Sequence, residues 1–288
     1  MKKACTIIIP TWNRFSVLVK TLEKLKGFRD PHLQVIVYDD CSERDFTADL
    51  ISQFSETGFI FKRSDRHVGP CELRNRMIRE ASSEFIIGLD DDSCFVSKQD
   101  CERAIDVIQT VPQAAIVGFK VLVKNGIQFP KFRNDDLCLV GTFLAGAFIA
   151  RKNFLLKVGG FDPSFIRGGG ERDLAIRLLD AGWDIYVCSN VEVFHERSSV
   201  ARDRQANHGY AFRNGLLFYL KYFSGVRCPL YILRHFLLHT AFCLVKGWFG
   251  AYWFGVRGFV CEFSRTLRTR KIVKRETMIK YLTLRRQT

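Results

Sequence analysis

The sequence lacks the two glycine-rich motifs that most often mark a phosphate-binding loop. No G-x-G-x-x-G follows the first expected strand, residues 5–9, and no G-x-x-x-x-G-K-[ST] occurs in the 288 residues. Rossmann-type dinucleotide binding and P-loop nucleotide binding therefore have no support in this chain. Any phosphate group that the protein binds must be held in another way.

Paired cysteines and an export signal are also absent. The ten cysteines include no Cys-x-x-Cys pair, and several, such as Cys5, Cys188 and Cys243, stand in apolar segments. We expect small buried side chains in a reducing compartment. The N-terminal residues lead into a short strand instead of the apolar core of a signal peptide. The sequence therefore predicts a cytoplasmic protein.

Acidic residues are scarce in the last 88 residues. These contain 17 Lys and Arg but 3 Asp and Glu, whereas residues 1–200 contain 27 of each kind. The whole net charge of +14 thus lies in residues 201–288. Such an asymmetry indicates an anionic partner, either a membrane surface or a nucleic acid. Because no motif that reads RNA or DNA is present, we expect no nucleic-acid binding.

Long uncharged runs are missing from this basic segment. Arg234, Lys246 and Arg257 interrupt the apolar residues 229–263, and the uncharged run 247–256 is well short of the roughly 20 residues that a spanning helix needs. Aromatic residues beside spaced basic ones are typical of a helix at a membrane surface, and the basic residues 265–286 would strengthen attraction to an anionic leaflet. The sequence predicts peripheral attachment to the inner face of the cytoplasmic membrane. The alternative is a helical lid packed on the rest of the protein.

Expected strands and helices alternate through the first third of the chain. Strands are expected at 5–9, 34–38, 59–61 and 85–89, and helices lie between them, among them 46–56 and 71–80. This alternation is typical of an α/β fold with a mostly parallel sheet flanked by helices. We predict such a domain over residues 1–200 and a basic, aromatic-rich helical segment over residues 201–288. Its helices are expected at 205–223, within 229–263, and at 277–284.

Three consecutive carboxylates follow one of these strands. Residues 85–89 read FIIGL and run directly into Asp90, Asp91 and Asp92. Open α/β sheets bind ligands at the carboxyl ends of their strands, and adjacent carboxylates there are costly unless a cation neutralises them. Mg²⁺ or Mn²⁺, shared with substrate phosphates, suits such ligands. The alternative is a solvated acidic turn. Asp39, which follows the expected strand at 34–38, would suit a nucleotide base or sugar.

Six short segments then follow one another in a characteristic order. They are IIIPTWNR (7–14), VIVYDDCS (35–42), HVGPCELRN (67–75), GLDDDS (88–93), GGFDPSF (159–165) and GERDLAIRLLDAGW (170–183). Together they resemble the family 2 glycosyltransferases over roughly residues 4–200. The resemblance implies a GT-A fold that transfers a sugar from a nucleoside diphosphate donor with inversion at the anomeric carbon.

The resemblance also implies roles for single residues on the donor side. Asp39 would meet the nucleobase, and the other donor-binding positions would be Pro10, Thr11, Asn13, Gly69, Arg74, Asp90 and Asp91. Asp90 and Asp92 would form the Asp-x-Asp pair, with Asp92 as the direct ligand of Mn²⁺ or Mg²⁺. His195, after an expected strand at 191–194, would complete the metal site. Its alternative is a hydrogen-bonded structural histidine.

The base that activates the acceptor is expected in the segment GERDL. Glu171 matches the acidic position that usually acts as base, and Asp173 is the second candidate, although the first turn of a helix also suits an acid that caps it. The glycines at 168–170 predict either a hinge that closes over the substrates or an ordinary loop. The acceptor side would include Gly146, Phe161 and Asp162.

These observations favour an inverting, metal-dependent glycosyltransferase. It would transfer a sugar to a saccharide or lipid-linked acceptor in cell-surface polysaccharide synthesis. UDP or dTDP sugars are favoured because Asp39 can accept a hydrogen bond from N3–H of uracil or thymine. The alternative is a non-catalytic, membrane-attached partner in a polysaccharide assembly, in which the altered acidic segment has lost the base. A nucleotidyltransferase is disfavoured because PTWNRFS (10–16) replaces the glycine-rich basic loop that such enzymes need.

Overall fold

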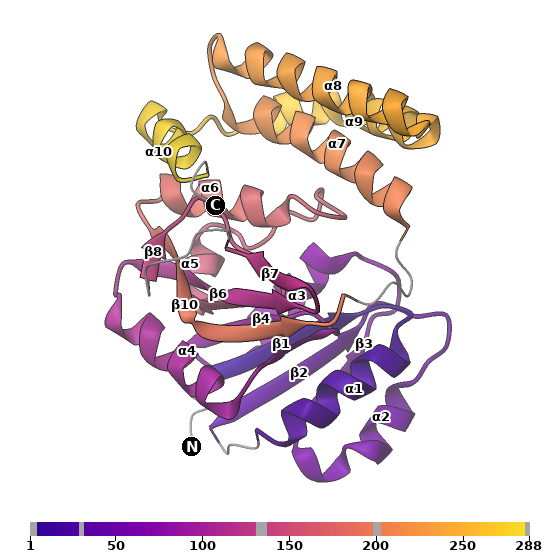
Figure 1. Ribbon diagram of the computed structural model, residues 1–288, viewed down its shortest axis with the longest axis vertical. Coiled ribbons are helices and arrows are strands. Elements are labelled where there is room, and N and C mark those ends of the chain that lie inside the picture. Colours follow the sequence, from indigo (N-terminus) through magenta and orange to yellow (C-terminus); the bar gives the residue numbers. More distant parts are fainter. Residues whose placement is uncertain (1–4, 29–31, 131–136, 198–202, 286–288) are drawn as a thin grey trace.

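One ten-stranded sheet lies at the centre of the protein, and helices flank it (Figure 1). The computed structural model describes residues 5–28, 32–130, 137–197 and 203–285. The strands are β1 (Cys5–Thr11), β2 (Leu33–Asp39), β3 (Ile60–Arg63), β4 (Phe85–Leu89), β5 (Ser93–Phe95), β6 (Ala114–Val123), β7 (Gly126–Phe129), β8 (Leu137–Leu139), β9 (Ala147–Arg151) and β10 (Asp184–His195). The helices are α1 (Phe15–Lys26), α2 (Thr47–Gln53), α3 (Pro70–Glu80), α4 (Lys98–Thr110), α5 (Lys152–Lys157), α6 (Gly170–Asp180), α7 (Arg204–Tyr222), α8 (Arg227–Lys246), α9 (Phe249–Thr269) and α10 (Arg275–Arg285).

The order of the strands brings the predicted acids to one edge of the sheet. The order is β3-β2-β1-β4-β9-β6-β10-β5, with β7 beside β6 and β8 beside β10. Strands β3, β2, β1 and β4 are parallel, so their carboxyl ends share an edge. Thr11 at the end of β1 is level with Asp39 at the end of β2, and Asp90 directly follows β4. Ligand binding at this edge is the usual arrangement in open α/β sheets.

Strand β4 is buried along its whole length, as its apolar run predicts. Gly88 is required there because a Cβ at this position would lie 2.0 Å from Cε1 of Phe148 on the neighbouring strand β9. Burial of a side chain such as Ile86 or Ile87 contributes about 1.5–3 kcal/mol relative to exposure. The acids after β4 therefore start from a rigid, tightly packed strand.

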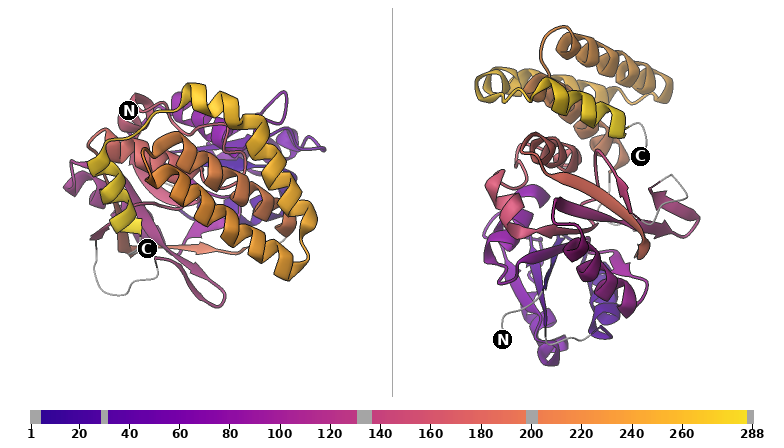
Figure 2. Two further views of the ribbon diagram at one scale, coloured as in Figure 1. Left: turned by 90° about the horizontal axis from the view of Figure 1, so that it is seen from above. Right: turned by 90° about the vertical axis from the view of Figure 1, so that its left-hand side faces the viewer.

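Helices α7, α8 and α9 form a layer beyond α6, away from the sheet (Figures 1 and 2). Asp203 caps α7, since its carboxylate accepts hydrogen bonds from the backbone nitrogens of Gln205 and Ala206 at 2.8 and 3.1 Å. Glycines let α7 and α9 approach closely, because a Cβ on Gly255 would lie 3.1 Å from the carbonyl oxygen of Gly209. Most of the second half of α7 is buried, whereas α8 lies on the outside of the layer.

Helix α10, which lies outside this layer, packs on α6, and α6 lies against the sheet. Arg172 Nε donates to Tyr281 Oη of α10 at 3.1 Å, and Thr277 Oγ1 donates to Asp180 Oδ1 at 2.7 Å. The apolar core of the sheet continues into α7 and α10, where it includes Tyr222 and Tyr281. The division at residue 200 therefore stays a prediction.

The predicted α/β fold with flanking helices and a C-terminal helical segment is confirmed. A parallel arrangement holds for the strands up to β4 and for β6 with β10, whereas all pairs made by β5, β7, β8 and β9 are antiparallel. All ten cysteines lie in the described residues, and none forms a disulfide; Cys5, Cys188 and Cys243 are buried, as predicted.

The apolar residues 229–263 form most of α8 and α9. Among the described residues, α8 is long and apolar enough to cross a membrane, by length and composition alone. The uncharged runs of this segment are short, yet α8 meets both criteria because an apolar helix of this length can carry a few charges. The expected position at a membrane surface stays a prediction. Arg234 lies exposed in the middle of α8.

Candidate functional site

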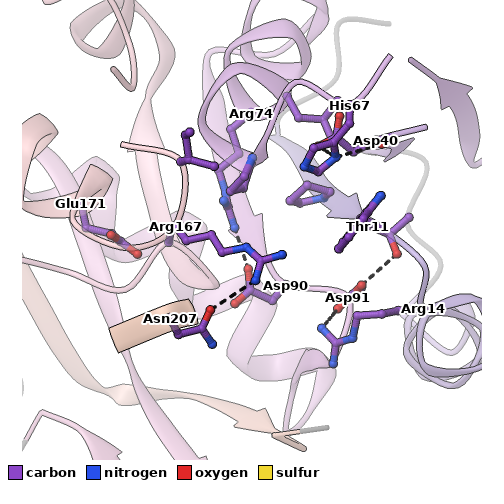
Figure 3. Close-up of a pocket in the computed structure, with 16 residues that line it drawn as sticks. Thr11, Arg14, Asp40, His67, Arg74, Asp90, Asp91, Arg167, Glu171 and Asn207 are labelled. Carbon is purple, nitrogen blue, oxygen red and sulfur yellow. Dashed lines mark hydrogen bonds and ion pairs between the residues drawn. The ribbon is translucent and has the colours of Figure 1, made fainter. Parts of the chain in front are cut away.

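A cavity of about 360 Å³ opens at the carboxyl ends of β1, β2 and β4 (Figure 3). The predicted site residues that line it are Pro10, Thr11, Arg74, Asp90, Asp91 and Glu171. The polar and aromatic side chains that line it without having been predicted are Trp12, Arg14, Asp40, His67, Arg167 and Asn207. Elements from the start, the middle and the C-terminal third of the chain thus meet at this main cavity.

A second cavity of about 230 Å³ adjoins the main one. Asp90, Ala145 and Glu171 line both, and His195 and Gly146 line the second. Gly146, predicted on the acceptor side, lies against Asp90, because a Cβ at this position would lie 2.4 Å from Asp90 Oδ2. Any larger residue would displace that carboxylate. Asp90 and Glu171 therefore stand where the two cavities meet.

Arg14 holds two of the three consecutive acids. Its Nη2 lies 2.6 Å from Asp92 Oδ2, its Nη1 contacts Asp91, and Thr11 Oγ1 donates to Asp91 Oδ2 at 2.8 Å. Burial raises the pKa of Asp91 to about 7 in spite of Arg14. Burial alone would also raise the pKa of Asp92, but its hydrogen bonds to His195 and Arg14 and their charges hold that pKa well below its usual value. Asp91 and Asp92 are buried, so a solvated turn does not describe them.

Asp90, Asp92 and His195 converge as the sequence predicts for a metal site. One ligand atom from each lies within 4.8 Å of the others. Asp90 Oδ1 pairs with Arg74 Nη2 at 2.6 Å, while His195 Nε2 lies 3.1 Å from Asp92 Oδ1 and Nδ1 lies 2.9 Å from Gln128 Oε1. Two carboxylates and one imidazole form a donor set that suits Mn²⁺. The carboxylate oxygens of this set also suit Mg²⁺. The residues present therefore fit a divalent cation.

Asp40 supports the opposite wall of the main cavity. Its two oxygens accept the backbone N–H groups of Val68 and Gly69, both at 2.8 Å, and His67 Nδ1 lies 3.0 Å from Oδ2. The ring of Trp12 lies 4.8 Å from that of His67. Gly69 thus contributes its backbone N–H to this wall. The rings of Trp12 and His67 on the same wall face the cavity.

Two residues predicted on the donor side, Asp39 and Asn13, lie outside the lining of the main cavity. The Asp39 carboxylate is buried, with Arg63 Nη1 at 2.5 Å from Oδ2 and Ser42 N at 3.1 Å. Asn13 Oδ1 accepts the backbone N–H of Glu43 at 2.8 Å, which ties the loop after β1 to the loop after β2. At the end of β2 it is Asp40, next to Asp39, that lines the cavity.

The glycines before α6 set the position of Glu171. Gly168 and Gly169 have φ angles of 74° and 89°, which side chains rarely adopt. A Cβ at Gly170 would lie 2.7 Å from Cys71 Sγ, so α6 begins directly against α3. This close approach directs Glu171, in the first turn of α6, to the junction of the two cavities.

Asp173, two residues further along α6, lies in a different place. Its carboxylate is fully buried, and it accepts hydrogen bonds from Arg177 Nε at 3.0 Å, from Lys221 Nζ at 3.1 Å and from the hydroxyl of Tyr222. It lies outside the lining of both cavities. The structure thus separates the two acids that the sequence offers as candidate bases.

Two residues predicted on the acceptor side lie near Asp173 instead. Phe161 is buried, and its backbone N–H and C=O bind the side-chain amide of Asn75 at 2.8 and 2.7 Å. Asp162 accepts from Ser164 N at 2.9 Å and pairs with Lys221. Both line a third cavity, of about 370 Å³, between the loop before α6 and helices α7 and α9. The structure therefore does not bring them together with Gly146.

Arg167 and Asn207 are site residues that sequence reasoning missed. Arg167 Nη1 lies 3.5 Å from Asn207 Oδ1, and its guanidinium lies 5.8 Å from the centre of the Trp12 ring and 5.9 Å from that of Tyr210. No ion pair of Arg167 with a carboxylate occurs in the part of the chain that the structure describes. Arg167 stands just before the glycines at 168–170, and this position could have marked it as a site residue. Nothing in the sequence around Asn207, on α7, marks it in this way.

Known proteins resemble this chain in sequence. A family model described as "Glycosyl transferase family 2" matches residues 6–174. The chain belongs to this family. An uncharacterized glycosyltransferase of Haemophilus influenzae is 25% identical over 185 residues, which are 60% of this chain and 61% of that protein. The O-antigen chain rhamnosyltransferase WbaN of Salmonella anatum is 24% identical over 219 residues, 68% of this chain and 67% of WbaN.

Solved structures confirm the predicted GT-A type of fold for this family 2 member. The mannosyltransferase PcManGT from Pyrobaculum calidifontis, in complex with GDP-Man and Mn²⁺, has a TM-score of 0.60 at 14% identity. The likeness covers 99% of this chain and 86% of PcManGT, so it extends over the helical layer. The match to the Haemophilus protein, by contrast, spans less than two thirds of that protein's length.

Proposed function

We propose that this protein is an inverting glycosyltransferase of cell-surface polysaccharide synthesis. It would transfer a sugar from a nucleoside diphosphate donor to a saccharide or lipid-linked acceptor. The observation that carries the proposal is the junction of the two cavities, which is lined by both Glu171 and Asp90. Asp90 is itself a member of the group Asp90, Asp92 and His195. Membership of family 2 and the similarity to WbaN support the same reaction class.

The donor diphosphate would be held from two sides. Asp90, Asp92 and His195 would hold Mn²⁺ or Mg²⁺, which when bound would stabilise, as a Lewis acid, the negative charge of the departing diphosphate. Arg167 faces the same cavity, and a guanidinium suits phosphate oxygens because it offers parallel N–H donors. We infer that Arg167 binds the diphosphate directly.

Glu171 would be the base. The acceptor hydroxyl would donate its proton to the Glu171 carboxylate as its oxygen forms a bond to the anomeric carbon and the bond from that carbon to the diphosphate breaks. A productive acceptor places its hydroxyl about 2.6–3.2 Å from that carboxylate. Attack from the face opposite the leaving group inverts the configuration of the sugar. Asp173 is an unsuitable base because Arg177, Lys221 and Tyr222 already engage its buried oxygens.

UDP and dTDP sugars are the donors that we propose. The argument from Asp39 requires its carboxylate to accept N3–H of uracil or thymine, and Arg63 and Ser42 engage that carboxylate in the structure. A base would reach Asp39 only if Arg63 turned aside. Trp12 and His67, whose rings line the main cavity, would flank the base. Binding of GDP with equal affinity would contradict this choice of donor.

The helical layer would attach the enzyme to an anionic membrane surface at the inner face of the cytoplasmic membrane. One face of α8 exposes the large apolar side chains Leu230, Leu233, Leu237, Leu238, Leu244 and Val245. Basic residues are close to this face and no acid occurs in α8, which suits an anionic leaflet. We favour a position at the surface over a spanning α8 because spanning would place the exposed Arg234 in hydrocarbon. Arg286, part of the predicted basic cluster, lies outside the described residues.

Vesicle binding tests this attachment. The full chain is expected to sediment with vesicles that contain phosphatidylglycerol, less with pure phosphatidylcholine, and less with anionic vesicles at high salt. Val245→Glu and Leu238→Glu should weaken binding, whereas Ile51→Glu, on an exposed apolar position of α2, should not. If no vesicle binding occurs and the purified chain is a dimer through α8, a second copy covers this face.

The reaction itself is tested by release of nucleoside diphosphate from a panel of nucleotide sugars. The assay includes Mn²⁺, Mg²⁺ or a chelator, with membrane extract as the source of acceptor. Turnover that requires the cation and is lost in Asp92→Asn and Glu171→Gln is the expected result. If the wild-type protein binds a donor but never releases nucleoside diphosphate, the proposed activity is wrong.

A further inference from the structure

Gln128 of β7 lies behind the proposed metal site, and the sequence gives no hint of it. Its side chain lines the second cavity together with Asp90 and His195. Strand β7 pairs with β6 through Phe129 with Val121 and through Ile127 with Leu122, so the pairing skips Gln128. Gln128 is therefore the extra residue of a β-bulge, and such bulges re-aim a side chain. Here the side chain is aimed at His195.

Two side chains form hydrogen bonds with Gln128, and together they identify which atom of its side-chain amide faces His195. Arg197 Nε lies 3.2 Å from Gln128 Oε1, and His195 Nδ1 lies 2.9 Å from the same atom. A guanidinium can only donate hydrogen bonds, so the atom that Arg197 contacts must be the carbonyl oxygen of the amide. An oxygen can only accept from His195, so Nδ1 carries a proton.

The protonation of Nδ1 determines what the other ring nitrogen offers. Without a cation, Nε2 can carry a proton as well and donate it to Asp92; a cation displaces that proton, and Nε2, with Nδ1 still protonated, then offers its lone pair. Nε2 is the atom that lies 3.1 Å from Asp92 Oδ1, on the side of the proposed cation. A lone pair beside a carboxylate oxygen is favourable when a cation joins the two. Outer partners of this kind set the tautomer and orientation of metal-binding histidines.

We propose that Gln128, held by Arg197, is a positioning residue that keeps His195 in the tautomer and orientation required to bind a divalent cation. The proposal rests on the proposed function, since it concerns the same metal site. It adds a residue of the bulged β7 hairpin to that site. Gln128 acts through His195 and takes no part in the reaction.

Binding of Mn²⁺ to the full chain, followed by the electron paramagnetic resonance of the free ion, tests the proposal without a turnover assay. Gln128→Leu removes the acceptor at nearly constant size and should weaken Mn²⁺ binding about 10–100-fold. Gln128→Glu keeps an acceptor at the same place and should restore affinity to within a few-fold of the wild-type value. Ile127→Leu, at the exposed neighbouring position, is the matched control and should change nothing.

The outcomes separate this inference from the proposed function. If the wild-type protein binds Mn²⁺ and Gln128→Leu binds it equally well, the inference is wrong and the metal site stands. Equal weakening in Gln128→Leu and Gln128→Glu would also overturn it, because the effect would then come from the bulge and not from the acceptor. If the wild-type protein does not bind Mn²⁺, both the metal site and the role of Gln128 are rejected.

Discussion

Two groups of acids in this protein are balanced by positive charge to different extents. The first, which we name the cavity cluster, consists of Asp90, Asp91 and Asp92 with Arg14 and Arg74. The second, the α6–α7 network, consists of Asp162 and Asp173 with Arg177, Lys221 and Tyr222.

The comparison of formal charges separates a binding site from a structural contact. When all three carboxylates of the cavity cluster are ionised, above the pKa of about 7 that burial gives Asp91, the two guanidiniums leave one negative charge for a cation to neutralise. Two carboxylates meet two cations in the α6–α7 network, which leaves none. Asp90 is also about one third exposed at a cavity, whereas Asp173 is fully buried. An acidic residue therefore indicates a binding site when its charge is incompletely matched and it borders a cavity.

The largest expected effect on stability is that of Asp173→Asn. It would leave the positive charges of Lys221 and Arg177 buried with less negative charge beside them. Breaking a buried ion pair in this way costs about 3–5 kcal/mol. Chemical denaturation should show this loss, and Mn²⁺ should not reverse it. Asp106→Asn, on the exposed face of α4, is the control and should stay within about 0.5 kcal/mol of the wild-type value. An unchanged stability of Asp173→Asn would remove the distinction between the two groups.

Asp90→Asn should show the opposite behaviour. Although Arg74 is buried, Asp90 is about one third exposed at a cavity, where water can take its place beside Arg74, so the pair should contribute about 1 kcal/mol or less to stability. Mn²⁺ affinity, measured by calorimetry, should fall more than about tenfold, since even outer partners of a metal are worth that much. If this substitution destabilises the protein strongly and leaves Mn²⁺ binding intact, the cavity cluster is structural.

The smallest expected effect is a change in acid sensitivity. Burial alone would raise the pKa of Asp162, but the Lys221 ammonium and hydrogen bonds hold it below its usual value. The unfolded chain then binds a proton at higher pH than the folded one, so this contribution is present above about pH 4 and is lost as the pH falls below it. The free energy of unfolding, measured with urea, should fall between pH 5 and pH 3 for the wild-type protein. This fall should be about 1 kcal/mol smaller in Asp162→Asn. An identical loss in both proteins would contradict the role of Lys221.

The first half of the fold could be predicted because its signals are local. The apolar runs that form β1, β2 and β4 end in proline or in acids, and the observed strands differ from the expected ones by two residues at most. The antiparallel insertion of β9 between β4 and β6 depends on pairing between residues far apart in the chain, and no local signal announces it.

The candidate site was predictable to the extent that it lies in short segments. Glu171 and Asp90 come from such segments and line the same two cavities. The choice between Asp39 and Asp40 depends on which way each side chain turns at the end of β2, which the spacing of the segment leaves open. Asn207 and Gln128 reach the site through the packing of α7 and through a bulge, so their positions follow only from the folded chain.

The central claim is that Glu171 does the chemistry while its neighbour Asp173 holds the structure. It is tested most directly by measuring kcat and the free energy of unfolding for Glu171→Gln, with a donor that the wild-type protein uses. We expect kcat to fall about 10²–10⁴-fold, as for loss of a general base, with donor affinity and stability unchanged. Turnover within a few-fold of the wild-type rate would contradict the account, and the base would have to be sought elsewhere on the cavity wall.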